Sequence, residues 1–314
     1  MSPTGLAFAG VGWLGESLIK ELPGVPELEL TGVQDARLEL AREVSAKYGG
    51  VWFGSQYTQL LALPGVDGVV ICTPNALHVP QAAQALRAGK HVLVQKPLAL
   101  SFAEARWLID LARDAERMLF VDYTYRFLET IAALRQALAR LGQVRAVTAQ
   151  FHNLYGPGAE KTWFFDRKLS GGGALLDLGV HLLDLALWLF QPHQVSLEEA
   201  RLVRGGIERE AELRVRLDAE VPFDLAVSWN APLAQTRIAF DIDAEHGRLR
   251  WENVDGSFFR FRTVLDHTLL IERETTLRID TLRAFAVALK TSDAPAVDAR
   301  VYALLDQAYA TDDV

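Results

Sequence analysis

The hydrophobic pattern of the chain changes near residue 122. Before that point, short apolar runs alternate with longer segments in which apolar residues recur every three or four positions. The runs predict β-strands, and the segments between them predict amphipathic helices. Strands that are apolar on both faces and alternate with helices are typical of a parallel sheet covered on both sides. The predicted strands are 6–12, 28–35, 51–54, 68–74, 91–97 and 117–123, and the predicted helices include 37–48, 78–88 and 101–115.

Later in the chain, apolar and polar residues alternate strictly, as in 212–218, 223–229 and 238–243. This pattern is typical of an antiparallel sheet with one solvated face. We therefore expect two domains. Residues 1–122 should form an α/β domain with a doubly wound, mostly parallel sheet. Residues 123–314 should form an α+β domain with an open, mainly antiparallel sheet, and two amphipathic helices at 279–290 and 299–310 close the chain.

Composition narrows the classes of partner. The chain has 32 basic and 40 acidic residues, a net charge of −8, so charge gives no reason to expect nucleic acid or an anionic membrane as a partner. Its one cysteine, Cys72, excludes an internal disulfide and predicts a reducing compartment, the cytoplasm. No basic residue precedes the apolar N-terminus, and no apolar run approaches the ~18 residues of a membrane helix, so neither a signal peptide nor a membrane span is expected.

A glycine-rich loop follows the first predicted strand and opens the first helix. Residues 10–15 read Gly-Val-Gly-Trp-Leu-Gly, which is the spacing of a dinucleotide-binding loop in the required context. In such a loop the first glycine permits a tight turn, the second lets a diphosphate reach the backbone, and the third lets the helix pack on the strand. The predicted cofactor contacts in this loop are Gly10, Gly12, Trp13, Leu14 and Gly15.

Asp35 ends the second predicted strand, about 20 residues after the loop, where an acidic residue accepts hydrogen bonds from the adenosine ribose. A carboxylate at this point repels a 2′-phosphate, so the sequence favours NAD over NADP. Arg37 lies two positions on and attracts such a phosphate, so NADP stays an alternative. The other interpretation is a plain glycine turn in which Asp35 caps a helix.

The segment 171–190 is predicted to be a buried helix, yet it contains three ionisable residues. Asp177, His181 and Asp184 are spaced i, i+4 and i+7, which places them on one stripe of the helix. Because a buried charge is costly without a partner, a charge, water or a ligand should lie opposite the stripe. Asp177 and His181 also have the spacing of two metal ligands, although no third ligand is evident. A third interpretation makes His181 an ordinary core histidine.

Two stretches carry a resemblance to a known family. Residues 72–99 read CTPNALHVPQAAQALRAGKHVLVQKPLA, and the helix contains GGGALLDLGVHLLDLAL. Together with YRF at 125–127 and LGQV at 141–144, they resemble the oxidoreductases related to glucose–fructose oxidoreductase and inositol dehydrogenase, the Gfo/Idh/MocA family. The resemblance implies a Rossmann domain followed by a substrate domain, a nicotinamide cofactor, and Lys, Asp and His side chains around the reacting carbon. It covers most of the chain but does not indicate a substrate.

The resemblance assigns roles to individual residues. It implies that Lys96, Asp177 and His181 are catalytic, and that Thr73, Asn75, His78, Gln95 and Lys96 contact the cofactor. A histidine titrates near neutrality and is suited to take the hydroxyl proton during hydride transfer. Lys96 would stabilise the developing alkoxide and Asp177 would orient the histidine or the substrate. Gln95 departs from the Glu that the family usually carries, which either weakens a ribose contact or makes the surroundings of Lys96 more positive.

The sequence leaves three functions open. The first is an NAD(P)-dependent dehydrogenase of a sugar, cyclitol or related polyol. The second is a glycosidase that uses bound NAD for transient oxidation, and the third is a dinucleotide-binding sensor without activity, which the intact catalytic residues disfavour. We expect no metal, and a homodimer or homotetramer formed through the open sheet. Candidate substrate contacts, each equally interpretable as core, are Arg126, Tyr155 and Trp163.

Overall fold

The computed structural model describes residues 2–153, 159–203, 206–230 and 235–311. The chain forms two compact units, Met1–Asp122 with Arg278–Val297, and Tyr123–Leu277 with Asp298–Val314. Sequence patterning assigned everything after residue 122 to one domain. The segment Arg278–Val297 instead belongs to the first unit, because its helix packs against elements of that unit.

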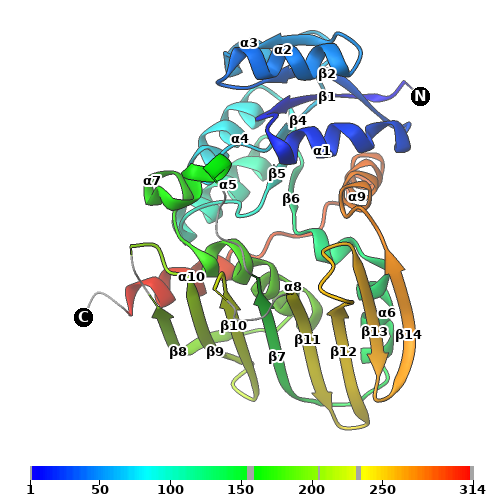
Figure 1. Cartoon of the computed structure of the whole chain (residues 1–314), viewed down its shortest axis with the longest axis vertical. Coiled ribbons are helices and arrows are strands. Elements are labelled where there is room, and N and C mark those ends of the chain that lie inside the picture. The colour runs from blue at the N-terminus through cyan, green and yellow to red at the C-terminus, as the bar shows by residue number, and fades with distance from the viewer. Residues whose placement is uncertain (1, 154–158, 204–205, 231–234, 312–314) are drawn as a thin grey trace. The chain divides into compact units, whose positions relative to one another are not determined.

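The first unit contains a six-stranded, wholly parallel sheet in the order β3-β2-β1-β4-β5-β6 (Figure 1). The predicted doubly wound parallel sheet is therefore confirmed. Its strands are β1 (Thr4–Ala9), β2 (Leu28–Gln34), β3 (Trp52–Gly54), β4 (Gly68–Ile71), β5 (His91–Gln95) and β6 (Leu119–Asp122). Its helices are α1 (Trp13–Glu21), η1 (Leu22–Gly24), α2 (Leu38–Lys47), α3 (Tyr57–Leu61), η2 (Asn75–Leu77), α4 (His78–Arg87), α5 (Phe102–Asp114) and α9 (Arg278–Thr291).

Helices cover both faces of this sheet, which explains why its strands are apolar on both sides. α1 and α9 contact each other, α4 packs on α5, and the two pairs lie on opposite sides of the sheet in Figure 1. All four residues of β4 are buried, as are the last four of β5. The α9 residue Phe285 packs edge-on against Phe120 of β6 at 5.4 Å between ring centroids. A late segment of the chain thus completes the core of the first unit.

The second unit contains an eight-stranded sheet in the order β14-β13-β12-β11-β7-β10-β9-β8. Neighbouring strands are antiparallel except β7 and β10, so the predicted mainly antiparallel sheet is confirmed. Its strands are β7 (Val144–His152), β8 (Val195–Val203), β9 (Glu210–Leu217), β10 (Val221–Ser228), β11 (Arg237–Ala244), β12 (Gly247–Asn253), β13 (Arg260–Leu265) and β14 (Thr268–Glu274). Its helices are η3 (Thr124–Phe127), α6 (Glu129–Leu138), η4 (Ala159–Phe165), α7 (Arg167–Ser170), η5 (Leu175–Gly179), α8 (Val180–Phe190) and α10 (Arg300–Ala310).

The two faces of this sheet differ as the alternation predicts. Along β9 the apolar residues are buried while Glu212 and Arg214 point to solvent. The buried face packs beneath the helices of the unit, as shown by Phe240 of β11, which lies 6.3 Å from the ring of Phe190 in α8. In Figure 1, α6, α8 and α10 lie together on one face of the sheet.

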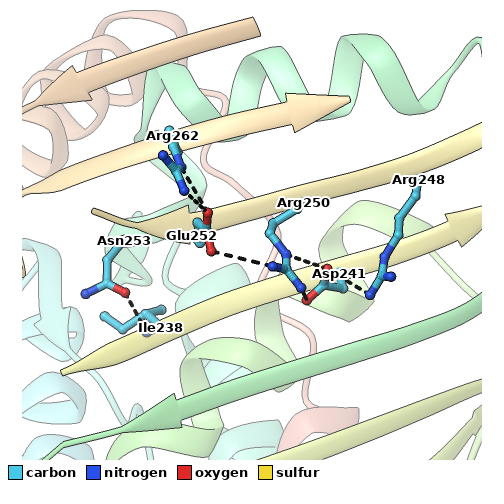
Figure 2. Close-up of polar contacts among 7 residues, drawn as sticks. All are labelled: Ile238, Asp241, Arg248, Arg250, Glu252, Asn253 and Arg262. Carbon is cyan, nitrogen blue, oxygen red and sulfur yellow. Dashed lines mark hydrogen bonds and ion pairs between the residues drawn. The ribbon is translucent and has the colours of Figure 1, made fainter. Parts of the chain in front are cut away.

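The solvent face carries a ladder of opposite charges across β11, β12 and β13 (Figure 2). Arg250 donates hydrogen bonds to both oxygens of Asp241, at 2.7 and 3.1 Å, and Arg248 donates a third at 3.3 Å. Arg262 donates two hydrogen bonds to Glu252, at 2.6 and 2.9 Å. Each of these carboxylates is therefore neutralised by guanidinium groups on adjacent strands.

One helical segment, Arg167–Phe190, is long and apolar enough to meet a membrane-span criterion, with a mean hydropathy of 1.6. The protein itself buries 72% of the apolar window of this segment. Its apolarity is thus accounted for by packing on the sheet and on α10. This segment is the core helix predicted from the sequence.

Candidate functional site

The glycine loop of the first unit has the geometry that a dinucleotide requires. Gly10 has φ +82°, and a Cβ there would lie 2.8 Å from the backbone of Cys72 and Thr73. A Cβ at Gly15 would lie 2.1 Å from the carbonyl oxygen of Gly10, so α1 approaches β1 only because residue 15 is glycine. A Cβ at Gly12 would meet nothing within 4 Å except the tip of Arg37, at 3.8 Å. The space beside Gly12 therefore lets an anion approach the backbone at the start of α1.

Asp35 lies where the sequence predicts it and connects the loop to the second strand. Its Oδ2 accepts the backbone N–H of Val11 at 3.1 Å, and its Oδ1 accepts the backbone N–H and the Nε of Arg37 at 3.0 and 3.2 Å. The carboxylate is mostly buried, whereas the Arg37 side chain is 70% exposed. Asp35 thus shapes the turn before α2 and also faces the glycine loop, but the N-cap of α2 is Arg37, so Asp35 is not the cap of that helix. The preference for NAD over NADP remains a prediction.

The loops after β4 and β5 lie side by side at the carboxyl edge of the parallel sheet, where such sheets bind ligands. His78 joins them, because its Nδ1 lies 2.7 Å from the carbonyl oxygen of Pro97 and its Nε2 lies 2.9 Å from that of Thr73. Burial lowers the pKa of His78, and the two carbonyl contacts partly oppose that effect. His78 was predicted to contact the cofactor. Its buried ring holds the loop carrying Thr73 and Asn75 beside the loop carrying Lys96, and the cofactor contact stays a prediction.

Lys96 directly follows β5 and is partly exposed at this edge. Its neighbour Gln95 is buried, and the Gln95 Nε2 donates to the Asp122 Oδ2 at 2.6 Å. The other oxygen of Asp122 accepts from the Thr281 hydroxyl of α9 at 2.6 Å. The sequence expected residue 95 to face the ribose. In the structure its amide contacts an adjacent strand, because Asp122 lies directly opposite Gln95 in the β5–β6 register.

In the second unit, the helix with the ionisable stripe begins with a π-helical turn, Leu175–Gly179, that contains Asp177. Such turns are rare in proteins, and many of those that occur lie at functional sites. Between residues 172 and 187, all of which the structure describes, only Asp177 and His181 are not buried. The Trp229 indole donates to the Asp177 Oδ2 at 3.1 Å, and the Tyr125 ring lies 5.0 Å from the His181 ring. Asp177 and His181 are therefore the two partly exposed side chains in a stretch of helix that is otherwise buried.

The third residue of the stripe, Asp184, has a structural partner. Arg126 donates to both Asp184 oxygens, its Nε at 2.6 Å, and both side chains are almost fully buried. Burial raises the pKa of Asp184 to about 6, even though the Arg126 guanidinium opposes this shift. Arg126 was a candidate substrate contact. Its burial and its ion pair favour the core interpretation, in which Arg126 fixes η3 to α8.

The remaining sequence candidates have separate outcomes. Trp163 is half-buried, and its ring is tilted against that of Phe164 with 4.2 Å between the centroids. The Phe164 ring in turn lies 6.2 Å from that of Trp229. Tyr155 lies outside the described residues. Among the described residues, no group of three His, Cys, Asp or Glu side chains is arranged to hold a metal ion. Cys72 is half-buried, and desolvation raises the pKa of its thiol, which disfavours a role as a nucleophile.

Sequence reasoning missed Trp229 and Asp122, which contact Asp177 and Gln95. Each lies far along the chain from its partner, 52 and 27 residues away. Trp229 ends the predicted strand 223–229, and Asp122 lies next to the end of the predicted strand 117–123, so both looked like ordinary strand termini. For Asp122 the position near the end of a parallel strand was a signal, because the carboxyl ends of such strands form the ligand edge of the sheet. Trp229 follows a strand of the other sheet and had no such signal.

Known families match both parts of the chain. The model described as "Oxidoreductase family, NAD-binding Rossmann fold" matches residues 4–123, and the GFO/IDH/MocA C-terminal domain matches residues 131–250. D-glucoside 3-dehydrogenase of Escherichia coli (strain K12) is 36% identical over 170 residues, which are 52% of this chain and 47% of that protein. The 1,5-anhydro-D-fructose reductase of Ensifer adhaerens is 31% identical over 201 residues, 62% of this chain and 60% of that protein. The chain thus spans about half of the length of these relatives.

A solved structure of levoglucosan dehydrogenase in complex with NADH and levoglucosan matches with a TM-score of 0.85 over 98% of this chain and 96% of that one. At 20% identity this likeness shows the fold alone. The glycine loop, the parallel sheet, the two domain matches and the helix motif agree with one another. The chain belongs to the Gfo/Idh/MocA family of oxidoreductases, with an NAD-binding Rossmann fold.

Proposed function

We propose that the protein is an NAD(P)-dependent dehydrogenase that acts on a hydroxyl group of a sugar, cyclitol or related polyol. The observation that carries the proposal is the pair Asp177 and His181, the only residues not buried between residues 172 and 187. A buried helix that opens to solvent only at an acid and a histidine has the groups needed to bind a hydroxyl and move its proton. Relatives named for oxidation or reduction of sugars support the substrate class.

Each residue then has a distinct task. A bound nicotinamide would supply hydride acceptance and donation. His181 takes the proton from the substrate hydroxyl, as a histidine can near neutral pH. Asp177 is held by the Trp229 indole and orients the substrate hydroxyl or the imidazole. The family resemblance assigns stabilisation of the developing alkoxide to Lys96, which follows β5 at the carboxyl edge of the parallel sheet.

The test follows NADH absorbance while the protein is mixed with NAD and a panel of sugars, polyols, cyclitols and glycosides. Net NADH formation with at least one polyol supports the proposal, and His181→Ala should abolish it. His193→Ala is a matched control, because His193 is an exposed histidine of the same unit and should have no effect. Cleavage of a glycoside without NADH accumulation would contradict the dehydrogenase proposal and favour a glycosidase that uses bound NAD. Binding of NAD without any turnover would indicate a sensor.

We infer that the charged face of the eight-stranded sheet pairs two copies of the chain. Its ladder contains both signs of charge on adjacent strands (Figure 2). A face of mixed charge can pair with a copy of itself across a two-fold axis. Arg214 and Asp224 continue this face across β9 and β10 with a 2.9 Å contact. Light scattering should give the mass of a dimer or tetramer. Arg214→Glu should lower that mass, and Arg106→Glu on α5 should not; a monomeric wild-type protein would contradict the inference.

The cytoplasmic location stays a prediction from the single cysteine.

A further inference from the structure

The helix that carries Asp177 and His181 is anchored at its start by a carboxylate from the segment just before β9. The Glu208 Oε1 accepts the backbone N–H groups of Gly173 and Leu175, at 2.7 and 3.2 Å. It also accepts the hydroxyl of Tyr309 from α10, at 2.7 Å. The Glu208 backbone carbonyl accepts the N–H of Ala174 at 3.0 Å. Four donors from two helices therefore converge on one residue that precedes β9.

The glycines before the helix make this contact feasible. A Cβ at Gly173 would lie 2.0 Å from the Glu208 carbonyl oxygen, and a Cβ at Gly172 would lie 2.3 Å from the Tyr309 hydroxyl. Neither glycine has a side chain that can cap the helix itself. Glu208 supplies the missing acceptor from 35 residues along the chain, and its negative charge interacts favourably with the helix N-terminus. The glycine run thus admits the carboxylate to the helix start.

The same segment reaches Asp177 by a second route. The carbonyl oxygen of Arg209, next to Glu208, accepts the backbone N–H of Trp229 at 2.8 Å. The Trp229 indole donates to Asp177, whose own N–H bonds to the carbonyl oxygen of Gly173 at 2.9 Å. Asp177 is therefore connected to residues 208 and 209 through the helix start on one side and through Trp229 on the other.

We propose that Glu208 is a positioning residue of the reaction, which with Tyr309 fixes the first turn of the helix and so sets the position of Asp177 against Trp229. Glu208 is only 3% exposed, so its carboxylate interacts with groups of the protein rather than with solvent. A carboxylate that deep is costly without donors, and here its donors are the groups whose placement matters for Asp177. The kinetic part of this proposal rests on the proposed dehydrogenase activity; the structural part does not.

The test compares Glu208→Ala, Glu208→Gln and Tyr309→Phe with Ser101→Ala. Ser101 caps α5 in the first unit by accepting the N–H of Glu104, so its loss is a matched loss of a helix cap away from Asp177. The first readout is the ¹⁵N–¹H resonance of the Trp229 indole, assigned by its absence in Trp229→Phe. We expect this resonance to move in Glu208→Ala, to move less in Glu208→Gln, and to stay in place in Ser101→Ala.

The second readout is steady-state kinetics on whichever polyol the wild-type protein oxidises. Because displacing a catalytic group by about 1 Å can cost on the order of 100-fold, kcat/KM for the polyol should fall by about 10- to 100-fold in Glu208→Ala. The Michaelis constant for NAD should not change, and Glu208→Gln should recover part of the loss because it retains an acceptor oxygen.

The outcomes separate this proposal from the proposed function. If no substrate is turned over, the dehydrogenase proposal fails, and the indole resonance alone decides the role of Glu208. If Glu208→Ala does not fold, Glu208→Gln and Tyr309→Phe provide the same comparison. An indole resonance and a kcat/KM that match Ser101→Ala in the folded variants would overturn the proposal.

Discussion

Replacing Gln95 by the Glu usual in the family should destabilise the protein in a strongly pH-dependent way. The wild-type amide donates to Asp122 across 2.6 Å, and both side chains are buried. Gln95→Glu removes that donor and places a second carboxyl against the first. Two ionised carboxylates at this distance repel each other by about 6 kcal/mol at an effective dielectric constant of ~20.

Protonation of the new carboxyl is the less costly solution, because an acid hydroxyl can replace the lost amide donor. For an acid with an unperturbed pKa of ~4.3, protonation costs about 4 kcal/mol at pH ~7 and about 1 kcal/mol at pH ~5. The folded protein thus raises the pKa of the new group. Its stability is highest below the unfolded pKa and is lost as the pH rises toward the folded value. The deficit against wild type should therefore be about 4 kcal/mol near pH 7 and about 1 kcal/mol near pH 5.

Urea unfolding of Gln95→Glu and wild type at these two pH values measures the deficit. The double variant Gln95→Glu with Asp122→Asn restores one amide facing one carboxylate, with the roles exchanged, and should recover most of the stability near pH 7. Asp122→Asn alone measures how much stability is lost when the hydrogen bond from Thr281 to the Asp122 carboxylate is altered. A deficit that is equal at both pH values, or absent, would refute this account and return Gln95 to the ribose role expected from the sequence.

Three further changes test other contacts. Asp35→Ser should narrow the preference for NAD over NADP, because it removes the carboxylate that repels a 2′-phosphate. Fluorescence titration measures both affinities. Tighter binding of NADP than of NAD by the wild type would contradict this account and make Arg37 the residue that selects the cofactor. Arg126→Leu should cost about 3–5 kcal/mol in urea unfolding, and less at acid pH, because Asp184 loses the guanidinium that lowers its pKa; a second change, Asp184→Leu, should recover most of the loss, and no recovery would contradict the ion-pair account. His181→Ala should lower kcat by about 10²–10⁴-fold without weakening NAD binding, and unchanged turnover would make another group the base.

The parts of the protein that depend on near neighbours were predictable from the sequence. Apolar runs interrupted by helical segments identified the parallel sheet, and strict alternation identified the open sheet. A strand buried on both faces is a continuous apolar run, whereas a strand buried on one face alternates apolar and polar residues. The glycine loop was predictable for the same reason. Gly10 adopts a positive φ and Gly15 touches Gly10 across a single turn, so both constraints act within a few residues.

The polar contacts that define the candidate site were decided by tertiary structure. The stripe Asp177, His181 and Asp184 indicated that partners must exist, but which partners depended on strand register and helix packing. Trp229, Tyr125 and Arg126 reach the stripe from 52, 56 and 58 positions away, and no local pattern encodes such separations. Packing likewise assigned α9 to the first unit, because an amphipathic period specifies an apolar face without specifying which core the face covers.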